Sequence, residues 1–151
     1  MDIYPATLLP ETLLVDLPEI DAQHEQIFHR IEALKASCFE NGYVPTDEFK
    51  SLLELFEHHF ATEERIAQES GLDFADHAGI HRDTLRLLRR ALGEVHGGGR
   101  DAHSFLRYSE YWFERHISED DRIFVAALRS GEYEQSLDFR RAARPFLSAQ
   151  A

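Results

Sequence analysis

Histidine is abundant in this sequence and recurs at a spacing that suits metal binding. Nine of the 151 residues are histidine, and His77 and His81 are four residues apart. His59 and Glu63 stand at the same spacing. On an α-helix, residues four apart lie one turn above each other and point the same way. Each pair can therefore close on a single metal region.

Two more histidines fall on the apolar faces of their segments. His24 shares a helical face with Ile20 and Ile27, and His116 is in line with Trp112. If the segments that carry His24, His59, His77 with His81, and His116 are four helices of one bundle, each helix directs at least one imidazole to the interior. The sequence thus predicts five inward histidines on four different segments.

The types of side chain indicate which metals could be held. Imidazole together with carboxylate suits iron, zinc or manganese, and a carboxylate run at 119–121 follows the last of these histidines. Cys38 is the only cysteine, which disfavours copper(I) and iron–sulfur centres. Five histidines are too many for one tetrahedral zinc ion. Two metals that share bridging carboxylates account for the set better.

The competing interpretation treats each histidine as an ordinary core residue. A single histidine on an apolar face is usually hydrogen-bonded to a neighbour and binds no metal. Five of them, however, would each need a partner in a core otherwise made of Leu, Phe and Ile. The metal interpretation is therefore favoured.

Four segments with helical periodicity position these residues. They cover approximately residues 19–40, 46–70, 74–95 and 101–128. Short connections between long amphipathic helices imply antiparallel neighbours, so we predict an all-α, up-down-up-down four-helix bundle over residues 19–128. Residues 1–18, which contain three prolines, are expected to form an extended N-terminal arm across the bundle. Residues 129–151 are expected to form a short polar C-terminal tail, with some helix around 133–144.

The bulk composition narrows the class of protein further. The net charge of −12 argues against a nucleic-acid partner, whose phosphates would be repelled. No stretch approaches the roughly 20 apolar residues needed to cross a bilayer, so no membrane association is expected. The first residues lack the basic region and cleavage site of a signal peptide. With a single cysteine, a cytoplasmic protein is expected.

Four sequence motifs, taken in order, resemble the signatures of the hemerythrin and bacteriohemerythrin family. They are EIDAQH (19–24), HFATEE (59–64), HAGIH (77–81) and WFERHISEDD (112–121). The resemblance implies a centre of two iron ions with an oxo or hydroxo bridge. By this resemblance His24 and His59 would hold one iron, and His77, His81 and His116 the other. Glu63 and Asp121 would bridge the two ions.

The spacing between His116 and Asp121 does not suit an ideal α-helix. Five residues correspond to about 140° of rotation, so the two side chains would not share a face. Asp120, four residues from His116, is the alternative bridging ligand. The family uses the five-residue spacing, which implies a local distortion of the helix.

The resemblance also implies a function, which is the reversible binding of dioxygen for storage, delivery or sensing. The expected lining of the oxygen pocket is Phe28, Phe60, Trp112 and Phe113, and Phe113 stands where the family usually has leucine. No catalytic residue is expected, because no spare acid or base is positioned to cleave an O–O bond. The alternatives are a di-iron redox enzyme that handles peroxide or nitric oxide, and a metal-dependent sensor or interaction module.

Overall fold

A computed structural model describes residues 9–41 and 46–138. Its helical elements are η1 (Glu11–Leu13), α1 (Pro18–Asn41), α2 (Thr46–Glu69), α3 (Ala75–His96), α4 (Ala102–Arg115), η2 (His116–Asp121) and α5 (Arg122–Asp138). The last three follow one another without a break and form a single rod. The described residues contain no strand, so the predicted all-α class is confirmed.

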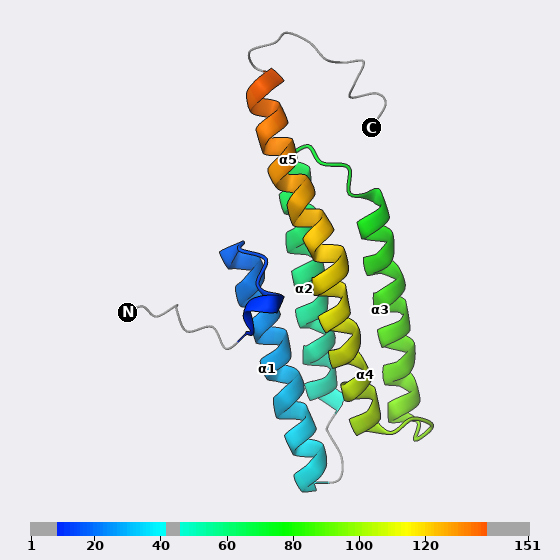
Figure 1. Cartoon of the computed structure of the whole chain (residues 1–151). Coiled ribbons are helices and arrows are strands. Elements are labelled where there is room, and N and C mark those ends of the chain that lie inside the picture. The colour runs from blue at the N-terminus through cyan, green and yellow to red at the C-terminus, as the bar shows by residue number, and fades with distance from the viewer. Residues whose placement is uncertain (1–8, 42–45, 139–151) are drawn as a thin grey trace.

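The helices form the predicted up-down-up-down bundle. α1 packs against α2 and α4, and α3 packs against α2 and α4, which closes a ring of four rods. Successive rods run in opposite directions (Figure 1). Gly71 and Gly98, with φ of 69° and 81°, adopt the left-handed conformation after α2 and α3, which helps those chains turn back. The Asp101 side chain caps α4 by accepting a hydrogen bond from the Ser104 amide at 2.9 Å.

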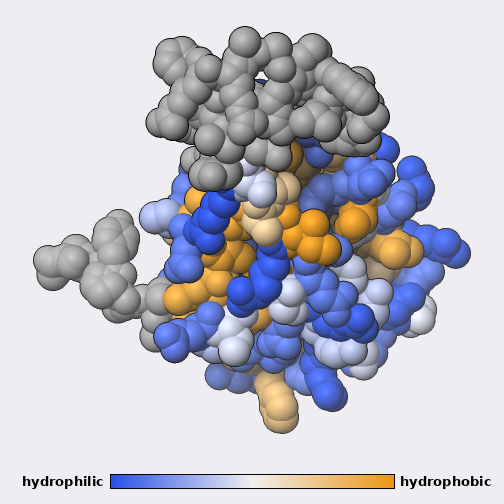
Figure 2. All heavy atoms as spheres, turned by 45° about the horizontal axis from the view of Figure 1, so that its top comes forward, coloured by the Kyte–Doolittle hydropathy of each residue, from blue (hydrophilic) through white to orange (hydrophobic). Residues whose placement is uncertain are grey.

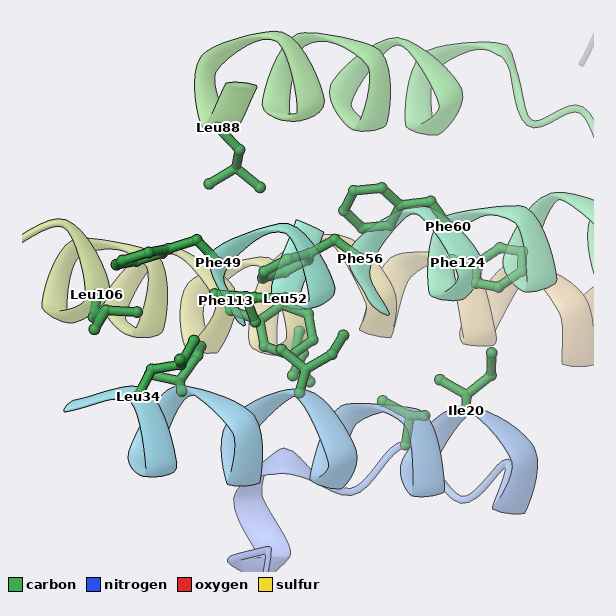
Figure 3. Close-up of a cluster of buried hydrophobic side chains, with 14 of the residues drawn as sticks. Ile20, Leu34, Phe49, Leu52, Phe56, Phe60, Leu88, Leu106, Phe113 and Phe124 are labelled. Carbon is green, nitrogen blue, oxygen red and sulfur yellow. The ribbon is translucent and has the colours of Figure 1, made fainter. Parts of the chain in front are cut away.

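The apolar core runs along the bundle axis on both sides of a buried polar layer. On α1, the buried Ile20 and Ile27 lie to either side of the buried His24. Farther along the bundle, Leu34, Phe49 and Leu106 pack together at one end of the cluster (Figure 3). This arrangement places polar side chains of α1 in the dry interior, where they need partners.

Two segments differ from the expectation at the sequence level. The described part of the arm contains a short 3₁₀ turn, Glu11–Leu13, and is not extended throughout. Residues 129–138 continue α5, so the last helix ends about ten residues later than predicted. These residues contain a single glycine and no proline, so nothing in their sequence terminates the helix. Residues 1–8 and 139–151, which complete the predicted arm and tail, lie outside the described residues.

The described part of the arm is tied to the bundle by hydrogen bonds. The amides of Val15 and Asp16 donate to the two carboxylate oxygens of Asp21, at 2.9 and 3.0 Å. The guanidinium of Arg122, directly after η2, donates to the carbonyl of Thr12. The arm therefore lies beside η2.

One face of the bundle is seen in Figure 2. Most of the face seen in Figure 2 is made of hydrophilic residues, with a smaller group of apolar ones between them. Among the described residues, no helix combines the length and the apolar character needed to span a membrane.

Candidate metal centre

All four rods contribute side chains to one buried polar layer. The exposed fraction is 0% for His24, His59, Glu63 and Asp121, 2% for His116 and 5% for His81. The side chain of His77 is 11% exposed. These seven residues are the ones that the sequence predicts as ligands, and their ligand atoms gather in two overlapping groups.

The first group contains two histidines. The Nε2 atoms of His24 and His59 are 3.0 Å apart. Oε2 of Glu63 lies 3.2 Å from His59 Nε2, and Oδ2 of Asp121 lies 3.1 Å from His24 Nε2. Two imidazole nitrogens and two carboxylate oxygens therefore converge.

The second group contains three histidines. Oε1 of Glu63 lies 3.1 Å from Nε2 of both His77 and His81. Oδ1 of Asp121 lies 3.2 Å from Nε2 of both His77 and His116. Three imidazole nitrogens and two carboxylate oxygens converge here.

The two carboxylates belong to both groups. Each of Glu63 and Asp121 directs one oxygen to the two-histidine group and the other to the three-histidine group. A carboxylate that bridges two metal ions has this arrangement. The side chains predicted to share an ion therefore lie together, two histidines in one group and three in the other.

Several atoms of the cluster fit a metal better than a hydrogen-bond network. Nε2 of His81, Nε2 of His116 and both carboxylate oxygens of Asp121 are buried without a hydrogen-bond partner. Uncompensated polar atoms of this kind are costly in a protein interior. The distances between the histidine Nε2 atoms and the carboxylate oxygens are 3.1 to 3.2 Å. Neighbouring ligand atoms around an ion held at about 2.1 Å are about 3 Å apart, so these distances match a metal site.

The segment η2 is a π-helix, and this explains the five-residue spacing. In a π-helix the hydrogen bonds run from residue i to residue i+5, so residues five apart lie above one another. His116 and Asp121 are the first and last residues of η2, and their side chains meet. Asp120, which is one-third exposed, instead accepts a hydrogen bond from Nδ1 of His116 at 2.9 Å. Asp121, and not the alternative Asp120, therefore reaches the cluster.

A hydrogen-bonded chain of side chains fixes the orientation of His59. Nδ1 of His59 lies 2.8 Å from the amide oxygen of Gln23. The amide nitrogen of Gln23 donates to the hydroxyl of Thr62 at 2.9 Å, and that hydroxyl donates to the carbonyl of His58. Because the Gln23 oxygen can only accept, Nδ1 of His59 carries the proton and Nε2 keeps its lone pair for a metal.

Aromatic rings pack against the three-histidine group. Phe60 stacks on His81 with ring centroids 3.8 Å apart, and Trp112 stacks on His116 at 4.7 Å. Phe74 stacks on His77 at 4.7 Å. Phe60 and Trp112, predicted to line the oxygen pocket, thus lie mainly against this group. Phe74 is not among the residues predicted to line the pocket.

The two-histidine group has a different aromatic neighbour. The ring of Phe113, which is fully buried, lies 5.2 Å from the ring of His24 and 6.0 Å from that of His59. Phe28 lies 5.0 Å from Phe113, on the side facing the surface. Of the four predicted lining residues, Phe28 and Phe113 are therefore the ones on this side of the cluster.

The cluster also shifts the pKa values of its members. Burial and the charge of Asp121 both act to raise the pKa of Glu63, but the contacts with its histidine neighbours prevail and lower it. Burial likewise acts to lower the pKa of His77, and the contacts with Asp121 and Glu63 outweigh it and raise the pKa to about 9. For His81 burial prevails, and the pKa is lowered. Burial also acts to raise the pKa of Asp121, but its contacts with the histidines outweigh this and lower the pKa. Both carboxylates are therefore ionised at neutral pH and available to cations.

Taken together, the fold and the cluster of histidine and carboxylate side chains fit a helical-bundle domain that binds cations. The family model of the hemerythrin HHE cation-binding domain matches residues 15–128 of the chain. The chain therefore belongs to the hemerythrin family, as its motifs indicate. No solved structure gives a significant match to the chain.

Proposed function

We propose that this protein holds two iron ions in the buried cluster and binds dioxygen reversibly at one of them. The observation that carries the proposal is the division of the two carboxylates. Glu63 and Asp121 each offer one oxygen to each histidine group, which suits two ions held side by side. Iron is preferred to zinc or manganese because of the family, since the ligand types alone accept all three.

The unequal number of ligands supports a ligand-binding role for the two-histidine ion. Four protein atoms converge in the group of His24 and His59, whereas five converge in the other group. An ion with fewer protein ligands keeps more room for an exogenous molecule. When bound, iron would supply electrons and a coordination position for dioxygen.

The surroundings of the two-histidine group support binding without turnover. The side chains packed against His24 and His59 include the ring of Phe113 and the amide of Gln23. Neither of them exchanges a proton at neutral pH. A dry, aprotic environment slows the protonation that would release or cleave a bound oxygen ligand.

Iron content and the visible spectrum, measured together, test the proposal. We expect two iron ions per chain and, after air is admitted to the reduced protein, a charge-transfer band that fades when oxygen is removed. Immediate and irreversible oxidation with two irons present would favour a redox enzyme or a sensor. Absence of iron, or a single zinc ion, would overturn the proposed centre.

A further inference from the structure

A groove on the outside of the bundle lies over the two-histidine group. It has a volume of about 800 Å³ and runs between the arm, α1 and α4. Leu13 of the arm, Gln23 and Phe28 of α1, and Glu110 of α4 are among its lining residues. We refer to it as the α1–α4 groove.

Two of these lining residues lead to the metal cluster, one by direct contact and the other through one intervening ring. Gln23 is hydrogen-bonded to His59. The Phe28 ring is packed on Phe113 at 5.0 Å, and Phe113 is packed on His24 at 5.2 Å. Phe28 is half-buried and Phe113 is fully buried, so the two rings form a short apolar connection from the groove to the first histidine.

Two smaller hollows lie near the cluster but adjoin its other side. Each has a volume of about 290 Å³. One is lined by Trp112 and His116, and the other by His77 and Ile123. Both adjoin the three-histidine group, where five protein atoms already converge.

We infer that small ligands reach the two-histidine ion from the α1–α4 groove, through momentary displacement of the rings of Phe28 and Phe113. This inference rests on the proposed function, because it assumes that a ligand binds at that ion. Rotation of a packed ring out of its preferred rotamer is a modest barrier, so the two rings set the rate at which a ligand passes. The apolar connection favours small uncharged molecules such as dioxygen.

The charge of the groove strengthens this selection. Glu32, Glu110 and Glu114 all line it. Lys35 binds both Glu32 and Glu110, at 2.8 and 2.9 Å, and its single positive charge offsets only one of these two negative charges. Negative charge along the α1–α4 groove repels anions and leaves neutral molecules unaffected. Azide should therefore enter more slowly at low salt than at high salt, whereas dioxygen should show no dependence on salt.

Variants that fill or open the route test it on the iron-loaded protein. We expect Phe28→Trp to slow both binding and release of dioxygen roughly five- to tenfold, and Phe28→Ala to accelerate both, with an unchanged dissociation constant. Ile123→Trp, which fills the hollow beside His77, is the matched control and should change neither rate. Iron content of each variant, measured first, confirms that the cluster is intact. Stopped-flow absorbance gives the rates.

A second measurement does not depend on oxygen binding. Xenon occupies apolar spaces in proteins, and zinc is accepted by histidine and carboxylate ligands. In the zinc-loaded protein, xenon should shift the NMR signals of the Phe113 ring more strongly after Phe28→Ala and less after Phe28→Trp.

The outcomes separate the route from the function. Slower binding in Ile123→Trp together with normal rates in Phe28→Trp would overturn the route and leave the proposed function standing. Failure of the iron-loaded wild-type protein to bind dioxygen would overturn the function. If the protein binds no dioxygen, the xenon experiment still tests the route. Xenon-induced shifts of the Phe113 signals that are the same in wild type and both Phe28 variants would overturn it.

Discussion

Asp120 and Asp121 are neighbours in the chain but have different partners, and this difference can be measured. Asp121 is fully buried and shared between the two histidine groups. Asp120 is one-third exposed and contacts Nδ1 of His116, at 2.9 Å. We predict that Asp121→Asn abolishes most of the metal-dependent stability, whereas Asp120→Asn leaves at least half of it.

The expected magnitudes follow from linkage between binding and folding. At a free metal concentration 100 times the dissociation constant, each ion adds about 2.7 kcal/mol to the free energy of unfolding, and two ions add about 5 kcal/mol. For a chain of this length that corresponds to a rise in Tm of about 10–20 °C. In Asp121→Asn one carboxylate oxygen is replaced by an amide nitrogen that does not bind a metal, and the remaining oxygen carries no negative charge, so both ions bind more weakly. If the affinity for each ion falls about 100-fold, the gain from both ions drops below about 1 kcal/mol.

Asp120→Asn should act indirectly, by weakening the hydrogen bond that orients His116. Loss of a carboxylate that orients a metal-bound histidine typically lowers the affinity for that metal by about 10- to 100-fold. Only the ion held by His116 is affected, so about 1.3 to 2.3 kcal/mol of the metal-dependent stability should be lost. Thermal unfolding of each variant with iron and with a chelator gives these differences. An Asp121→Asn protein that keeps the wild-type rise in Tm would refute the bridging role.

Three further predictions concern residues around the cluster. Gln23→Leu should weaken binding of the ion held by His59 by about 10- to 100-fold, because Nδ1 of His59 loses its hydrogen-bond acceptor. Competition with a chelator measures this affinity, and an unchanged value would contradict the role of Gln23 in orienting His59. The pKa of His77 is raised to about 9, so below that pH a proton occupies this side chain and competes with the metal. The apparent affinity for the metal should therefore rise by up to about tenfold per pH unit from pH 7 to 9 and then level off. The same competition experiment at a series of pH values checks this, and His77→Asn should flatten the profile. Phe60→Ala should reduce the free energy of unfolding by about 3–5 kcal/mol in urea, because it removes a buried ring that stacks on His81 at 3.8 Å; a loss below about 1 kcal/mol would show that this packing contributes little.

The fold could be predicted because its signals are local. The helical spacing of residues such as Ile20, Ile27 and Ile31 marks an inward face, and these side chains are buried in the structure. Glycine and proline between the segments mark the turns. The later end of α5 was missed because residues 129–138 carry neither a strong stop signal nor a strong apolar face.

The candidate site could be predicted in part. Pairs four residues apart, such as His77 and His81, follow directly from α-helical geometry. The match of His116 with Asp121 does not follow, because it requires a π-helix that α-helical periodicity does not indicate. That pairing came from the resemblance to the family.

The supporting contacts of the site were beyond prediction from the sequence. Gln23 meets His59 from a helix that is 36 residues away along the chain, and Phe74 reaches His77 from the residue before α3 begins. Such pairs depend on the relative position and rotation of helices. Neither residue type is distinctive enough to mark its role in advance.

The number of ions that the cluster accepts tests the central claim most directly. Metal-free protein titrated with ferrous iron under anaerobic conditions, with bound iron measured after removal of the excess, should saturate at two ions per chain. The division of Glu63 and Asp121 between the two histidine groups predicts this value. Saturation at one ion, or two ions that persist after Glu63→Ala and Asp121→Ala are combined, would contradict a centre bridged by these carboxylates.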